Sequence, residues 1–206
     1  MKKQLLFTVI AIAASSALTA QVTKGDILLG ASAGTGYNGY SSTGSAGSNS
    51  TNANIAPRIG FGIGRNSVLG ARLNFNYWNS KSPGTDYKQN NLGAGASIYW
   101  RHFMPIVSKV GWYIEPAAGV GTVRQKSQDI NGKSKINSFN ITATVVPGVY
   151  YQALPGLLLN ADFGGVNYQY SKNKNGTSVT SKSHSVSLGL FNSFTFGFDF
   201  ILGKKA

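Results

Sequence analysis

The sequence predicts an all-β fold, an eight-stranded antiparallel up-and-down transmembrane β-barrel. Three observations support this prediction. Apolar and polar residues alternate along many segments, short turns alternate with long polar connections, and lysine is absent from the alternating segments. A period of two is the pattern of a β-strand whose two faces differ. The segment SFTFGFDF, residues 193–200, shows it most clearly, with phenylalanine at every second position.

The N-terminus has the features of an export signal. Lys2 and Lys3 precede an apolar run over residues 5–14, and small residues follow up to Ala20. This order of basic, apolar and small-residue regions is typical of a secretory signal peptide. We therefore expect a signal peptide at 1–20 and a barrel domain at 21–206.

Eight segments show the alternation and supply the strands. They are residues 25–34, 55–63, 69–77, 92–101, 112–120, 139–151, 157–170 and 185–201. The seventh changes phase at Gly164 and Gly165, where we expect a β-bulge. The connections are short at 64–67, 103–109 and 153–156, and long at 37–53, 78–90, 124–138 and 171–183. Hairpins of this kind can close into a barrel, which removes both sheet edges.

The distribution of charge predicts which face meets lipid. Without Lys2 and Lys3 the chain has 17 basic and 6 acidic residues, a net charge of +11, yet no lysine lies within a predicted strand. A soluble sheet carries charged residues on its water-facing side, whereas a membrane barrel turns its apolar face to lipid. The charged residues of the strands all lie on the polar face. They are Arg58, Arg72, Arg101, Glu115, Asp162 and Asp199.

These six residues are expected to point into the barrel and form a lumen ion-pair network. An eight-stranded barrel is just wide enough for side chains to fill it, so an arginine can reach a carboxylate on another strand. We predict one or two ion-pair clusters which, with Tyr99, Tyr113 and inward asparagines, block a continuous water channel. Arg101 and Asp199 are expected near the mouth formed by the short turns, and the other four somewhat deeper.

The long connections carry most of the excess positive charge. Nine basic residues lie there against Asp86 and Asp129. The nine are Lys81, Lys88, Arg124, Lys126, Lys133, Lys135, Lys172, Lys174 and Lys182. We expect a basic extracellular rim that contacts the phosphates of lipopolysaccharide or acidic polymers outside the cell. Nucleic acid is disfavoured as a partner, because these charges flank a membrane domain and lack interleaved aromatic residues.

The sequence resembles the small outer-membrane β-barrels of Gram-negative bacteria, the OmpA- and OmpX-like porin-family kind. The resemblance covers the whole chain after the signal, and it rests on the export signal, the glycine-led first strand GDILLGASAG and the aromatic last strand. It implies location in the cell outer membrane, a periplasmic N-terminus, exterior long loops, and insertion by the outer-membrane assembly machinery. Such barrels commonly end on the last aromatic residue, whereas ILGKKA follows Phe200 here.

Catalysis is not expected. Lipid A deacylases resemble this fold and place a serine two residues after a histidine. In this chain the residue two after His102 is Met104, and the residue two after His184 is Val186, so neither histidine has that serine. The chain has no cysteine and only these two histidines, so no metal site or other cofactor is predicted.

The expected role is that of a monomeric barrel with a structural or surface-interaction function. The alternative is a passage for small or apolar solutes, either a narrow pore or a lateral route. A lumen filled by side chains favours the first function, and an unobstructed lumen favours the second.

Single cysteines test the predicted topology in a chain that has none of its own. A cysteine at Ser45, Lys133 or Lys174 should react with a membrane-impermeant thiol reagent in intact cells, because these positions lie on the exterior side. A cysteine at Asn66, in a short turn, should react only after the outer membrane is permeabilised. The opposite pattern of labelling would reverse the orientation.

Overall fold

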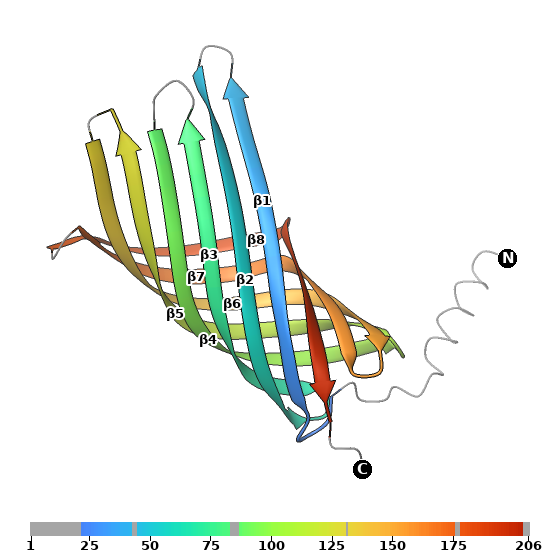
Figure 1. Ribbon diagram of the computed structural model, residues 1–206. Helices are drawn as coiled ribbons and strands as arrows, with labels where there is room; N and C mark the ends of the chain where they lie inside the picture. Colours follow the sequence, from blue (N-terminus) through green and yellow to red (C-terminus); the bar gives the residue numbers. More distant parts are fainter. Residues whose placement is uncertain (1–21, 43–44, 83–86, 131, 176–177, 204–206) are drawn as a thin grey trace.

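A computed structural model describes residues 22–42, 45–82, 87–130, 132–175 and 178–203, so the expected signal peptide lies outside the described residues. Eight antiparallel strands follow one another around a barrel (Figure 1), which confirms the predicted fold class. The strands are β1 Ile27–Ser42, β2 Ser45–Gly64, β3 Ser67–Ser82, β4 Tyr87–Val107, β5 Val110–Asp129, β6 Gly132–Leu154, β7 Leu157–Asn175 and β8 Ser178–Leu202. No helix in the described chain is long and apolar enough to cross a membrane.

The strands are longer than predicted, and this corrects the expected long loops. The segments 37–53, 78–90, 124–138 and 171–183 mostly continue the strands into tall hairpins, as in the pairing of Asp129 with Gly132. The turn expected at 103–109 is also shorter, because β4 continues to Val107. Apolar alternation marks only the part of a strand that meets lipid, so the polar strand ends beyond it have no such signal.

The apolar face points outward, as predicted. On β8 the side chains of Phe194, Phe196, Phe198 and Phe200 are 42–66 % exposed, whereas Asp199 is fully buried. This arrangement is the reverse of a soluble barrel and is the one that a lipid-facing surface requires.

The turn end of the barrel is closed from within by a small apolar core, which the sequence did not predict. Leu28, Val68, Phe103 and Leu158 are at most 1 % exposed, and Phe103 packs edge-on against Tyr150 with ring centroids 5.3 Å apart. At Leu28 and Leu158 the neighbouring outward residue is also leucine. Two adjacent apolar residues hide the period of two, so the inward member could not be recognised.

The irregularity predicted in β7 is confirmed. The pairing of β7 with both neighbours changes register around Gly164 and Gly165, whose φ angles of 83° and 154° suit glycine and strain other residues. Asp162 pairs with Thr195 but Gly164 with Leu190, so β8 carries three more residues than β7 across this step. The interruption of the apolar pattern at Asn192 falls within these extra residues.

The barrel is closed by a short ladder. β1 pairs with β8 only from Ile27↔Leu202 to Ala33↔Phe196, although β1 follows β2 to Ser42 and β8 follows β7 to Ser178. Beyond this ladder, residues 34–42 and 178–195 are not paired with each other, and Figure 1 shows the strands diverging toward the hairpin tips. The expectation that closure removes both sheet edges is therefore correct only at the turn end. We call this opening the β1–β8 seam.

Close packing of the lumen can be tested at Gly148. A Cβ atom there would overlap the ring of Tyr113 and the carbonyl of Ala161, whereas a Cβ at Gly64 would meet open space. Gly148→Ala should lower the free energy of unfolding by about 1–3 kcal/mol, the usual cost of overpacking. Urea unfolding in lipid vesicles measures this, with Gly64→Ala as the matched control. Equal stability of the two variants would mean that the lumen is loosely packed.

Candidate functional site: a buried ion-pair layer and an outward basic belt

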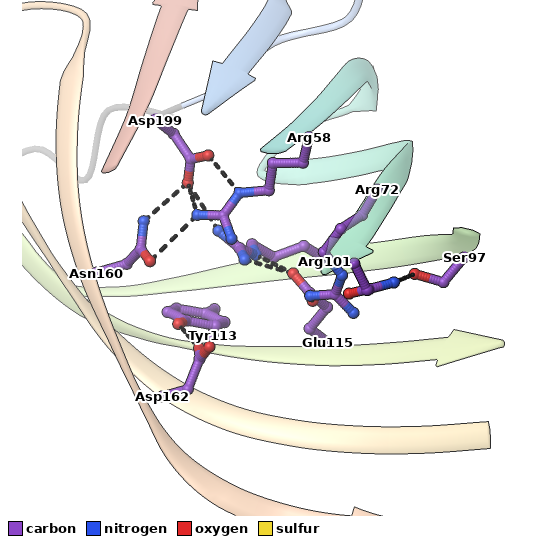
Figure 2. A network of polar contacts seen from close by, with 10 residues as sticks. Arg58, Arg72, Ser97, Arg101, Tyr113, Glu115, Asn160, Asp162 and Asp199 are labelled. Carbon is purple, nitrogen blue, oxygen red and sulfur yellow. Dashed lines mark hydrogen bonds and ion pairs between the residues drawn. The ribbon is translucent and has the colours of Figure 1, made fainter. Parts of the chain in front are cut away.

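Charged side chains from five strands meet in one layer across the barrel (Figure 2). Asp199 on β8 accepts hydrogen bonds from Arg58 on β2, with Nε–Oδ1 2.6 Å and Nη2–Oδ2 2.9 Å. Asn160 on β7 donates to Oδ2 of Asp199 at 3.0 Å and accepts from Nη2 of Arg58 at 3.2 Å. Every oxygen of the Asp199 carboxylate therefore has a partner.

Arg101 on β4 links this cluster to a second carboxylate. Its Nη1 donates to Oδ2 of Asp199 at 2.8 Å and its Nε donates to Oε2 of Glu115 on β5 at 2.6 Å. Arg72 on β3 donates from Nη1 to Oε1 of Glu115 at 2.7 Å. The side chains of Arg58, Arg101, Glu115 and Asp199 are only 1–2 % exposed, and that of Arg72 is 14 % exposed.

Asp162, the sixth charged residue, lies beside this layer and makes no ion pair with it in the described chain. It accepts a hydrogen bond from the hydroxyl of Tyr113, and the Tyr113 ring centroid is 4.4 Å from the Arg101 guanidinium carbon. The structure thus joins five of the six predicted residues by ion pairs. Asp162 reaches them only by way of Tyr113, which contacts Arg101. Three arginines and three carboxylates leave this region without net charge.

The strand register explains why carboxylates from distant strands are needed. Arg58 and Arg72 are directly paired neighbours on β2 and β3, and like charges in this position repel. Asp199 and Glu115 relieve the repulsion from opposite sides of the lumen. Gly30 on β1 faces Asp199 in the ladder, and a Cβ at position 30 would overlap the carboxylate. Asn160 was not singled out from the sequence, although it lies two residues before Asp162 on the same face.

The nine predicted rim residues lie in strands rather than in loops, which corrects their expected place. They occupy the outward face of β3 to β8, beyond the apolar surface, and all are exposed except Lys172, which is half-buried. The strand register sets basic residues directly opposite each other, as in Lys81↔Lys88, Lys126↔Lys135 and Lys172↔Lys182. We call these nine residues the basic belt. Its opposed lysines repel unless anions lie between them.

The two histidines have hydrogen-bond partners on neighbouring strands. Nδ1 of His102 lies 2.9 Å from Oγ of Ser67, and Trp100 stacks on the imidazole. Nδ1 of His184 lies 2.9 Å from the hydroxyl of Tyr168. The Ser67 contact was missed because the sequence does not give the pairing of β3 with β4. A serine–histidine hydrogen bond is one part of a nucleophilic site, which also needs an orienting group and an oxyanion site. Within the described chain, no group of three His, Cys, Asp or Glu residues could hold a metal ion.

Comparisons with known proteins agree with a membrane barrel. The sequence matches the family described as outer membrane protein beta-barrel domain over residues 7–191. The structure is similar to the translocator domain of the autotransporter NalP from Neisseria meningitidis, with a TM-score of 0.53 and 12% identity. That match covers 91% of this chain and 65% of the NalP chain, so this chain spans less than two thirds of its length. No curated protein gives a significant match.

Two further solved structures are more distant in shape. Neisserial surface protein A is 22% identical, with coverage of 86% of this chain and 97% of that chain and a TM-score of 0.35. Ail, the attachment invasion locus protein of Yersinia pestis, is 10% identical, with coverage of 87% and 100% and a TM-score of 0.43.

The coupling between Glu115 and its arginines can be measured by mutation. Glu115→Ala removes the carboxylate shared by Arg72 and Arg101 and should lower the free energy of unfolding by about 3–5 kcal/mol, because buried charges lose their partner. Adding Arg72→Ala should restore part of that loss. Urea unfolding in vesicles measures the free energies of unfolding of the single and double variants. The control is the double variant Glu115→Ala with Lys133→Gln, in which the two losses of stability should add. Additivity of Glu115→Ala and Arg72→Ala would contradict the ion-pair account.

Proposed function

The chain belongs to the family of outer-membrane β-barrel domains, and on this basis we propose that it is a non-conducting barrel with a structural or surface-interaction role, in which the basic belt binds the phosphates of lipopolysaccharide. The protein is located in the cell outer membrane. The observation that carries the proposal is the place of the belt, on the outward face of the strands where the apolar surface ends. The proposal places the headgroups of the outer leaflet at this level.

A groove on the outer surface supports this proposal. It has a volume of about 570 Å³ and lies across β4 to β7, with apolar walls from Leu92 and Phe139 beside the basic side chains of Arg124, Lys172 and Lys174. In a phosphorylated lipid, apolar chains adjoin an anionic headgroup, which matches apolar walls that adjoin basic side chains. A phosphate between two opposed lysines removes their repulsion and accepts charge-assisted hydrogen bonds from both.

The ion-pair layer and the apolar core beneath it favour the non-conducting role over a pore. Arg101, Glu115 and Asp199 meet in the lumen, and each is at most 2 % exposed. A single chain completes the ring at the turn end, which supports a monomer. Membership of the family supports the proposal that the outer-membrane assembly machinery inserts this chain. The proposed role requires no catalysis and no nucleic acid.

The belt can be tested by removing five of its charges. Replacement of Lys126, Lys133, Lys135, Lys172 and Lys174 by Gln should weaken lipopolysaccharide binding at low ionic strength by at least about tenfold, since each lysine near an anionic lipid surface contributes about 1 kcal/mol. Binding is titrated with the protein in phosphatidylcholine vesicles.

The matched control is Lys24→Gln with Lys109→Gln, two exposed lysines at the turn end. This variant should bind lipopolysaccharide as the wild type does, and high salt should reduce the difference between the two variants. If the five-fold variant binds equally well in low salt, the belt is only a solvated surface.

A further inference from the structure

The β1–β8 seam opens the lumen sideways above the ion-pair layer. The ladder between the two strands ends at Ala33 and Phe196, and residues 181–188 of β8 are exposed at every position, inward as well as outward. The outward side chains of Val186, Leu188 and Leu190 are 50–74 % exposed. Apolar residues with this exposure place the open edge at the depth of the lipid chains.

Unpaired strand edges are unfavourable at that depth. Lipid chains offer no hydrogen bonds, so backbone N–H and C=O groups must find partners in the protein or in a polar ligand. The seam therefore needs either to close or to admit a molecule that brings hydrogen-bonding groups with it.

A chamber with several polar side chains lies behind the seam. A cavity of about 300 Å³ sits above Arg72, with walls from Asn74, Asn76, Asn140, Thr142, Asn167 and Gln169. A second cavity of about 350 Å³ shares Thr144 and Asn167 with the first and reaches Ser187 and Gly189 on β8. The two cavities therefore adjoin, and the second reaches the inner face of β8 at the seam.

The chamber contains hydrogen-bonding groups without partners. Oδ1 of Asn140 and Nε of Arg72 are buried and have no hydrogen-bond partner in the described chain. The charge of Arg72 is balanced by Glu115, and the other polar groups of the first cavity are amides and hydroxyls, which both donate and accept. Small alanine, glycine and valine residues complete its walls, and the second cavity also contains the carboxylate of Asp162. A neutral ligand rich in hydroxyl groups satisfies such walls, whereas an anionic headgroup would lose its hydration without gaining a free counter-charge, because Arg72 is already paired.

We propose that the chamber binds the neutral, hydroxyl-rich sugar headgroup of a membrane amphiphile that enters from the outer leaflet through the β1–β8 seam. The acyl chain remains in the lipid against Val186, Leu188 and Leu190, and the headgroup passes Ser187 into the lumen. The ion-pair layer closes the route below. The chamber is thus a binding site with a side entrance, and it is separate from the basic belt.

The geometry of β7 and β8 allows the entrance to close. Continuing the register of the lower ladder would pair Thr35 with Phe194 and Gly39 with Leu190. Gly164 and Gly165, with their positive φ angles, lie beside the level at which the ladder ends. Closing the seam requires the upper part of the β7–β8 hairpin to move relative to the lower part. The two glycines lie between these parts, so the backbone can bend there.

A disulfide lock tests the entrance, since the chain has no cysteine of its own. The probe is dodecyl maltoside with a photoreactive diazirine in its chain, at low mole fraction in phosphatidylcholine vesicles. We expect wild-type labelling to concentrate on residues 186–190. Oxidised Thr35→Cys with Phe194→Cys should reduce this labelling by roughly tenfold, and reduction should restore it. Ala33→Cys with Phe196→Cys joins residues that are already paired, so this control should label as the wild type does.

A second variant tests the chamber without a disulfide. Asn140→Ala should weaken the labelling by up to roughly tenfold, as for the loss of one well-made hydrogen bond. The five-glutamine belt variant should label normally, which separates this site from lipopolysaccharide binding. A phosphocholine probe with the same chain should show no preference for the seam. Maltoside labelling spread evenly around the apolar surface, and unchanged by Asn140→Ala, would overturn the proposal.

Discussion

The bridge that Arg101 makes between Glu115 and Asp199 is the interaction on which the rest of the barrel depends. It joins β4 to β5 and β8 across the lumen, with Nη1–Oδ2 2.8 Å to Asp199 and Nε–Oε2 2.6 Å to Glu115. Arg58 and Arg72 stand side by side on β2 and β3, and they are tolerated because these two carboxylates lie between them and Arg101. Buried ion pairs add little net stability, but they penalise any register that separates the partners. The layer therefore fixes which strands face each other.

The barrel is organised in levels from the turn end upward. The apolar core around Phe103 and Tyr150 lies at the bottom, the ion-pair layer lies above it, and the amide-lined chamber follows. On the outside, the apolar surface gives way to the basic belt toward the hairpin tips. In the proposed function, the inner levels close the lumen, and the outer levels present surfaces to lipid chains and then to anionic headgroups. Both proposed binding functions follow from this order, one on each side of the same wall.

Much of the fold could be predicted from the sequence because lipid imposes a strict rule on strands. The alternation of phenylalanine on β8 and the absence of lysine from apolar segments gave the strand number, the lipid-facing side and the inward place of Asp199. The rule does not apply where strands leave the lipid, so the polar ends that carry Lys126 and Lys135 were mistaken for loops. It also fails at Leu28, because the inward Leu28 and the outward Leu29 are both apolar and the alternation is lost.

The sequence predicted which charged residues point into the lumen, but not which of them form ion pairs with each other. Inward position is a property of one strand, and Arg58, Glu115 and Asp199 each reveal it locally. Which arginine meets which carboxylate depends on the register between strands, as does the hydrogen bond of His102 to Ser67. The arrangement of the charges in one layer, the position of Asp162 beside it and the β1–β8 seam also depend on the register between strands. The phase change at Gly164 and Gly165 indicated a bulge but not that the wall opens beside it.

The most direct test of the account is the conductance of the wild-type protein in planar lipid bilayers. The proposed non-conducting role rests on Arg58, Arg101, Glu115 and Asp199, whose side chains meet in the lumen and are at most 2 % exposed. The account predicts no steady conductance steps above the bare-membrane baseline at moderate voltage. Steady single-channel conductance through the folded barrel would contradict it and would support a pore.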